Sequence, residues 1–292
     1  MMQHILAVLD QRHSSSVAFR AARRWAEKTG ARLSVFLPTE AIPPIGVHLG
    51  PGLLASVEHT AEMQAEQWLN DFLSGENQSV ERHAAVVHRW DQGVRHEFER
   101  IKADLVFISR ESAPTESEWK KLLRQLPGPT CIVRDDEPPR SILAAVSASP
   151  EDPAHQILND TVLQYTQNWS RLWDVSFKIA SALPNPLELA PLMGETYVAS
   201  YVEEEMTQAL RSGLVAWLER HSLPQDILCT RVGVVEAILA QEIDDSHANW
   251  VVMGTVGRRA MAAWFAGNSA ERIERHLQVN VLLLRPQDFQ ED

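Results

Sequence analysis

The sequence predicts an α/β protein made of two tandem, doubly wound domains, each built on a parallel sheet of five strands. Three observations support this fold class: a length of 292 residues, an internal repeat, and short apolar runs that alternate with helical segments. A chain of this length is too long for a typical single domain and can form two domains that each bury a core. Strands that are apolar on both faces and alternate with helices are typical of a parallel sheet covered on both sides.

The internal repeat consists of three apolar segments that occur once in each half. HILAVLD at 4–10 recurs as SILAAVS at 141–147, ADLVFI at 103–108 recurs as ANWVVM at 248–253, and CIVR at 131–134 recurs as LLLR at 282–285. The chain is therefore a tandem duplication. Between the halves, the polar and proline-containing segment RDDEPPR is typical of a linker. We expect a first domain at 1–137 and a second at 138–292.

The expected strands are short runs of mostly Val, Ile, Leu and Ala, and the expected helices are longer segments with helical spacing of apolar residues. In the first half the strands are expected at 4–9, 33–37, 82–88, 104–109 and 130–134, with helices at 14–29, 53–73 and 92–102. In the second half the strands are expected at 142–147, 174–180, 227–232, 249–254 and 280–285, with helices at 153–170, 198–221, 234–245 and 269–277.

A glycine-rich loop lies between the fourth strand and the last helix of the second half. Its glycines are Gly254, Gly257 and Gly267. Glycines allow backbone N–H groups to approach a ligand closely, and the following helix N-terminus offers unpaired donors and a partial positive charge. Arg258 and Arg259 add positive charge. The spacing alone leaves two interpretations open, an anion-binding loop and a simple turn from strand to helix.

The segment VVMGTVGRRAMAAWFAGNSAERIERHLQVNVLLLRP resembles the C-terminal third of a universal stress protein. Nucleotide-binding members of that family carry G-x2-G-x9-G-(S/T) at this point, and the three glycines here match the spacing. Asn268 stands where the hydroxyl residue is expected, and Ser269 follows one place later. An asparagine can still donate to a phosphate oxygen and cap a helix. The resemblance covers nearly the full chain and implies two Rossmann-like domains with strand order 3-2-1-4-5.

In that strand order a ligand lies outside the carboxyl ends of the first and fourth strands, where the order reverses. In the second half, the glycines would bring backbone N–H groups to a phosphate, and Arg258 with Asn268 or Ser269 would hold it. Val146 and Ser147 would line the nucleoside end. The full set of expected nucleotide-binding residues is Val146, Ser147, Met253, Gly254, Gly257, Arg258, Gly267, Asn268 and Ser269.

The first half lacks the glycine loop and is expected to be degenerate, without a phosphate site. It is about six residues shorter between the fourth and fifth strands, and Ser109 and Ser112 replace the first two glycines. Glu111 and Glu116 bring negative charge to this place. Nucleotide-binding relatives place an Asp at the end of the first strand, and only the first half has one, Asp10. Asp10 could equally serve as a helix N-cap or a loop carboxylate.

The composition argues against several classes of binding partner and of location. The formal net charge of −12 argues against nucleic acid and anionic membranes as partners, since both attract basic faces. No run approaches the roughly 18 apolar residues needed to cross a bilayer, and the N-terminus lacks a basic leader with a cleavage site, so a cytoplasmic location is expected. Cys131 and Cys229 are expected to be buried free thiols. The histidines lack metal-ligand spacing, and no catalytic motif is present.

The resemblance to tandem, E-type universal stress proteins implies a cytoplasmic stress-response protein that binds ATP or another adenine nucleotide in its second domain. No catalytic residue and no metal are expected. Two alternatives stay open: a scaffold that binds an apolar ligand or a protein partner through the long connections 39–55 and 181–200, and a slow ATPase. The apolar fifth strands predict that the two domains pair as a pseudo-dimer, because each would otherwise expose an edge. A homodimer is also compatible with the sequence.

Overall fold

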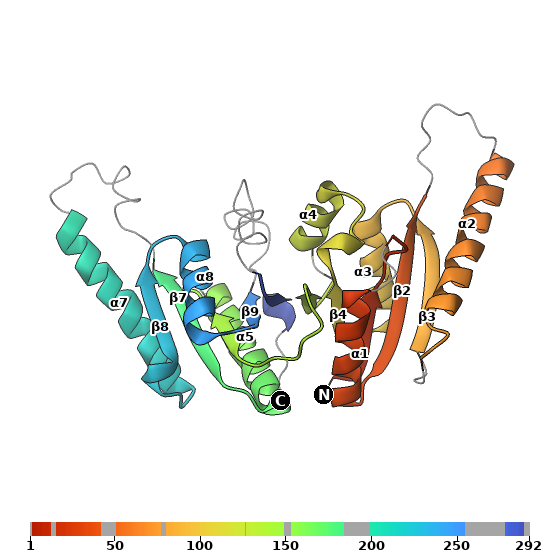
Figure 1. Ribbon diagram of the computed structural model, residues 1–292. Helices are drawn as coiled ribbons and strands as arrows, with labels where there is room; N and C mark the ends of the chain where they lie inside the picture. The colour runs from red at the N-terminus through yellow and green to blue at the C-terminus, as the bar shows by residue number, and fades with distance from the viewer. Residues whose placement is uncertain are drawn as a thin grey trace. The chain divides into compact units, whose positions relative to one another are not determined.

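The computed structural model describes residues 2–12, 16–41, 51–76, 80–125, 127–148, 153–183, 199–254 and 278–288. The chain forms two compact units, Met1–Pro138 and Pro139–Asp292 (Figure 1). Their boundary lies within the polar segment that separates the repeats. Asp136, just before it, accepts a hydrogen bond from Arg24 of the first unit at 3.2 Å. Each unit is described by itself below.

The first unit is a five-stranded parallel sheet with helices on both faces. Its strands are β1 (His4–Val8), β2 (Arg32–Glu40), β3 (Val80–Val87), β4 (Leu105–Ile108) and β5 (Thr130–Ile132). Its helices are α1 (Val17–Thr29), α2 (Pro51–Phe72), α3 (Trp90–Ile101) and α4 (Glu116–Arg124). The strand order is β3-β2-β1-β4-β5, and the paired strands are parallel. This is the predicted order 3-2-1-4-5.

The second unit repeats this arrangement. Its strands are β6 (Ile142–Ala145), β7 (Phe177–Leu183), β8 (Leu228–Val232), β9 (Trp250–Gly254) and β10 (Asn280–Leu284). Its described helices include α5 (Pro153–Trp173), α7 (Ala199–Arg220) and α8 (Val235–Ser246). The order β8-β7-β6-β9-β10 is again 3-2-1-4-5, with parallel pairs. The predicted α/β class, with two tandem doubly wound domains, is confirmed.

The central strands are buried because helices cover both faces of each sheet. Figure 1 shows α1 in front of the first sheet and α3 behind it. α1 contacts α2 through the edge-to-face rings of Phe19 and Phe72, 5.3 Å apart, whereas α3 packs against β2 and α4. Every residue of β1 and β4 is buried. Continuous apolar strands are therefore possible here, as the sequence indicated.

Most predicted elements differ from the observed ones by a few residues at their ends, and three differences have a clear physical reason or signal. The prediction missed α4, although Thr115 followed by Glu118 is a helix-start signal: the Thr115 side chain accepts a hydrogen bond from the Glu118 N–H at 3.2 Å. β2 continues to Glu40, three residues further than expected. β7 begins at Phe177 rather than at 174, because Asp174 has φ 55° and ends the preceding helix in a turn. The helix expected at 269–277 lies outside the described residues.

The amino ends of the first strands are held by an Asx side chain in both units. Asp104 Oδ2 accepts from the backbone N–H groups of Gln3 and His4 at 2.7 and 2.9 Å. Asn249, at the same place in the repeat, accepts from the Arg140 N–H through Oδ1 at 2.8 Å. The side chain thereby satisfies backbone donors at the start of the sheet. We call this contact the amino-edge brace.

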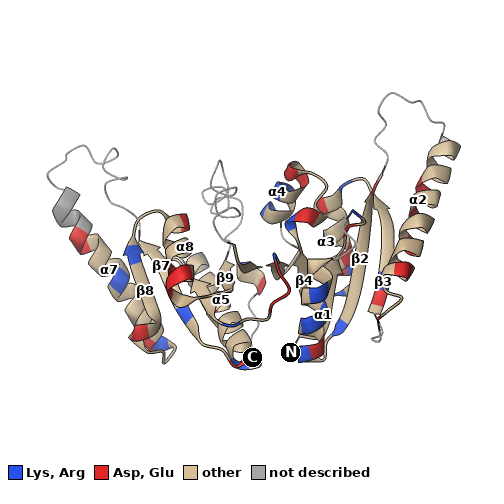
Figure 2. Ribbon diagram, in the orientation of Figure 1, with Lys and Arg blue, Asp and Glu red and all other residues tan. Residues whose placement is uncertain are grey.

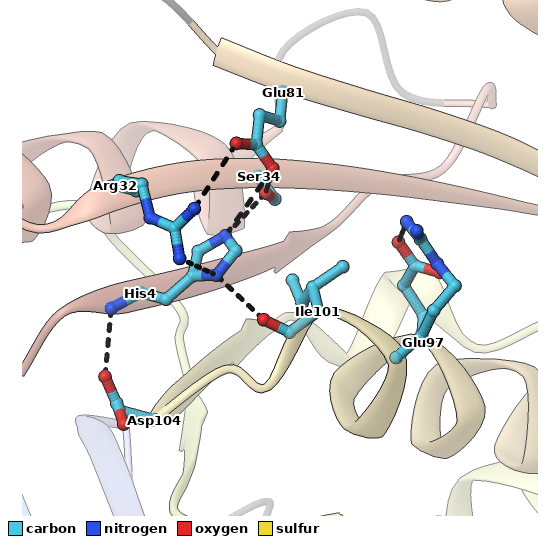
Figure 3. A network of polar contacts seen from close by, with 8 residues as sticks. His4, Arg32, Ser34, Glu81, Glu97, Ile101 and Asp104 are labelled. Atoms are coloured by element: carbon cyan, nitrogen blue, oxygen red, sulfur yellow. Dashed lines mark hydrogen bonds and ion pairs between the residues drawn. The ribbon is translucent and has the colours of Figure 1, made fainter.

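The buried His4 ring extends the polar network of the first unit (Figure 3). Its Nδ1 lies 3.0 Å from the carbonyl oxygen of Ile101, and its Nε2 lies 2.7 Å from Ser34 Oγ. Ser34 Oγ in turn donates to Glu81 at 3.2 Å. The ring and the serine are each less than 5% exposed, so this Ser–His pair connects β1, β2 and α3 inside the protein and is not accessible to a substrate.

A buried glutamate connects α3 in the first unit and α8 in the second to the edge strand of its sheet. In α3, Glu97 accepts from Arg100 at 2.7 and 2.8 Å and lies 2.9 Å from His83 Nδ1 of β3. Burial of Glu97 favours its neutral form, but the hydrogen bonds from Arg100 and His83 outweigh this and lower its pKa to about 2. In α8, the buried Glu242 pairs with Arg231 of β8.

Candidate functional site

The carboxyl ends of β6 and β9 lie side by side at the reversal of strand order in the second unit. Ala145 is in register with Met253. The residues that follow these two in the chain, Val146 and Gly254, are therefore neighbours at the carboxyl edge of the sheet. Val146 and Met253 are buried, whereas Ser147 and Gly254 are half-buried. Of the nine residues predicted to bind nucleotide, these four are brought together by the fold. We call the place outside these strand ends the crevice, because doubly wound folds bind ligands there.

The other five predicted residues lie outside the described part of the chain. They are Gly257, Arg258, Gly267, Asn268 and Ser269. Their role therefore stays a prediction from the sequence. Most of the two long connections, predicted at 39–55 and 181–200, also lies outside it, at 42–50 and 184–198, while their ends belong to β2, α2, β7 and α7.

Asn159 of α5 holds the backbone of Ser147 with two hydrogen bonds. The Ser147 N–H donates to Asn159 Oδ1 at 2.9 Å, and Asn159 Nδ2 donates to the Ser147 carbonyl oxygen, also at 2.9 Å. The asparagine side chain is buried, with the residue 6% exposed. Sequence reasoning did not identify Asn159, since a lone Asn within a helix carries no motif. The contact fixes the backbone at the carboxyl end of β6.

Gly254 lies directly beneath Leu158 of α5. A Cβ atom placed on Gly254 would lie 2.2 Å from Leu158 Cγ, far inside van der Waals contact. Leu158 is itself 6% exposed, so it has little room to move aside. Helix packing therefore requires a glycine at this position, and this requirement is independent of any phosphate ligand.

The corresponding crevice of the first unit, between β1 and β4, is crossed by an arginine. Arg12 Nε donates to Asp10 Oδ1 and Oδ2 at 3.0 and 2.8 Å, and the Arg12 N–H also donates to Asp10. On the other side, Arg12 Nη2 donates to the carbonyl oxygens of Glu111 and Ala113 at 2.9 and 3.4 Å. Asp10 is thus a loop carboxylate. The α1 N-cap is Ser16, which accepts from the Phe19 N–H.

The serines that replace the glycines in the first unit contact each other and the first strand. Ser109 Oγ lies 3.0 Å from Ser112 Oγ, and Ser112 Oγ lies 3.3 Å from the Val8 carbonyl oxygen. Glu116 is the first residue of α4 and pairs with Arg110 and Lys120. Partial burial favours its neutral form, yet these hydrogen bonds lower the pKa of Glu116. Side chains of the first unit itself, Arg12, Ser109 and Ser112, therefore join the carboxyl ends of β1 and β4.

The described helices differ in charge (Figure 2): α1 carries four basic residues and one acidic residue, whereas α2 and α8 carry acidic residues and no Lys or Arg. Within the described ranges, no group of three or more His, Cys, Asp and Glu side chains could hold a metal ion. None of the helices in these ranges combines the length and apolar character required to cross a membrane.

Sequence comparison shows similarity to universal stress proteins. The model of the universal stress protein family matches residues 185–285. Universal stress protein E of Salmonella typhi is 25% identical over 313 residues, an alignment that covers 99% of this chain and 96% of that protein. Its E-type counterpart in Photorhabdus laumondii is 26% identical over 315 residues, with the same coverage.

The fold also occurs in solved structures. A putative universal stress protein from Pseudomonas aeruginosa UCBPP-PA14 superposes with a TM-score of 0.69 at 21% identity, covering 98% of this chain and 94% of that one. A universal stress protein from Archaeoglobus fulgidus superposes with a TM-score of 0.59 at 12% identity and covers 96% of each chain. At such identities these likenesses show the fold alone.

Proposed function

Because this chain belongs to the universal stress protein family and has the tandem organisation of its E-type members, we propose that it is a binding protein of the stress response. Its ligand is ATP or another adenine nucleotide, held in the second domain at the carboxyl ends of β6 and β9. In this proposal the protein acts by binding its ligand and not by catalysis. We place it in the cytoplasm.

One observation supports this assignment: the carboxyl ends of the first and fourth strands are joined by side chains in the first domain but not in the same way in the second. In the second domain, Ser147 and Gly254 end adjacent strands at the reversal of strand order, the position at which doubly wound folds bind ligands. In the first domain, Arg12 spans the same gap and is hydrogen-bonded on both sides. A ligand would have to break those hydrogen bonds before binding there.

The sequence after Gly254 supports an anionic ligand. Gly257, Arg258 and Gly267 would provide backbone N–H groups and positive charge, and Asn268 or Ser269 would donate to phosphate at the start of a helix. Val146 and Ser147 would contact the nucleoside. Met253 would support the loop from beneath, since it is buried in β9.

Mass spectrometry of small molecules released from the purified, denatured protein tests the proposal first, followed by calorimetric titration with ATP. We expect one site per chain. Absence of binding at millimolar ATP, together with a co-purified apolar molecule, would instead support the scaffold alternative. Release of phosphate during the titration would support the slow ATPase.

A further inference from the structure

α5 contacts both sides of the crevice of the second domain through two consecutive residues. Leu158 packs on Gly254 at the end of β9, and Asn159 binds Ser147 at the end of β6. Consecutive helical residues point about 100° apart, and α5 packs over both β6 and β9. One turn of α5 therefore contacts both strand ends, which are already paired in the sheet.

The first domain lacks this arrangement. The spacing that relates Asp10 to Ser147 also relates Ala21 to Leu158 and Ala22 to Asn159. Both alanines of α1 are buried, but a methyl group cannot form the hydrogen bonds that Asn159 makes. Ser109, which replaces Gly254, carries the side chain that Leu158 would exclude. The first domain joins its two strand ends through Arg12 instead.

We propose that Leu158 and Asn159 are positioning residues for the nucleotide site, an inference that rests on the proposed function. Asn159 sets the nucleoside end, because it holds the N–H and the carbonyl of Ser147. Leu158 positions the backbone at the phosphate end, because its side chain packs against Gly254, the first glycine of the predicted loop. Each residue therefore influences the binding of one part of the ligand through the backbone that it holds, without contacting the ligand itself.

Two probes separate the two ends: adenosine, and inorganic tripolyphosphate. For Asn159→Ala we expect adenosine affinity to fall about fivefold, the order of one hydrogen bond's net contribution, while tripolyphosphate affinity stays within about twofold. Asn159→Asp should lose at least as much adenosine affinity, because it keeps the acceptor for the Ser147 N–H but places a carboxylate oxygen against the Ser147 carbonyl oxygen. Asn168→Ala, an exposed asparagine on the same helix, is the matched control and should change neither affinity.

The phosphate end is tested with Gly254→Ala, Leu158→Ala and the double variant. Gly254→Ala alone should weaken tripolyphosphate binding and spare adenosine. The double variant should recover most of that loss, because removing the leucine side chain gives the new methyl group room. If the loss of tripolyphosphate affinity in the double variant equals the sum of the losses in the two single variants, the role of Leu158 is overturned.

Amide hydrogen exchange at Ser147 provides a readout that needs no ligand. Asn159→Ala should speed this exchange, and Asn168→Ala should not. A wild-type chain that binds neither probe overturns the proposed function and, with it, the positioning of a ligand by α5. A wild-type chain that binds both, with affinities and Ser147 exchange unchanged in Asn159→Ala, overturns the role of Asn159 alone.

Discussion

Arg12 donates from its guanidinium Nε to both carboxylate oxygens of Asp10 and reaches the backbone beyond β4 with the same side chain. The acid that nucleotide-binding relatives offer at the end of the first strand is thus already neutralised within the first domain. Arg12 connects two segments about one hundred residues apart in sequence, and it does so at the place where the strand order reverses.

Replacing Arg12 by alanine should destabilise the protein only modestly, by about 1 kcal/mol, because the side chain is half-exposed and water screens the pair. ATP stoichiometry should stay at one per chain, since Glu111 and Glu116 still oppose phosphate. Denaturant unfolding and calorimetric titration measure the two effects. Arg20→Ala, which removes a looser pair with Asp136 at 3.5 Å, is the control. A second ATP site in Arg12→Ala would contradict the degenerate first domain.

Glu97 should make the stability of the first domain sensitive to acid. Its folded pKa of about 2 lies below the ordinary 4.5, so its contribution is fully present above pH 4.5 and is lost as the pH falls toward 2. The contribution is on the order of 2–3 kcal/mol. Unfolding free energies measured from pH 7 to pH 3 should fall less steeply for Glu97→Gln than for wild type. Glu99→Gln, an exposed change on the same helix, should follow the wild-type curve.

The glycine loop should respond to substitution at its second glycine. Gly257→Val should weaken ATP binding at least about tenfold, or roughly 1.4 kcal/mol, because a side chain would hold phosphate away from the backbone, while unfolding stays cooperative. Ser147→Asp should strengthen adenosine binding by restoring the acceptor that nucleotide-binding relatives carry at the adenosine end. Calorimetric titration of both variants decides, and equal ATP affinities for Gly257→Val and wild type would indicate that the glycine serves the turn alone.

The two thiols should differ in reactivity. Cys131 is fully buried in β5, and burial raises its pKa well above the usual value. Cys229 was expected to be buried but is half-exposed in the edge strand β8. Burial, with a hydrogen bond to Glu242, raises the pKa of Cys229 as well. A thiol reagent at pH 8 should label Cys229 slowly and Cys131 only after unfolding. In Cys229→Ser, rapid labelling of the native protein would contradict the buried position of Cys131.

The strands could be predicted from the sequence because runs such as HILAV and LVFI are buried on both faces, which leaves a strong pattern. Their order followed from the resemblance to the universal stress proteins and not from this pattern. α4 was missed because its buried residues, Trp119, Leu122 and Leu123, lie in a segment interpreted only as a shortened loop. The contacts of Asn159, Leu158 and Arg12 could not be predicted, since each joins distant segments through a single side chain. The pairing of the two domains through their fifth strands stays a prediction, which cross-linking between β5 and β10 would test.

The amino-edge brace has a consequence for how binding could be communicated. Asp104 and Asn249 hold the first strand of each sheet at the end opposite the crevice, so the sheet keeps its anchor whether the crevice is full or empty. The empty protein should then be as well folded as the occupied one. A partner protein that distinguishes the occupied from the empty state must therefore bind at the carboxyl edge of the sheet, where α5 contacts both strand ends, because the rest of the fold is the same in both states.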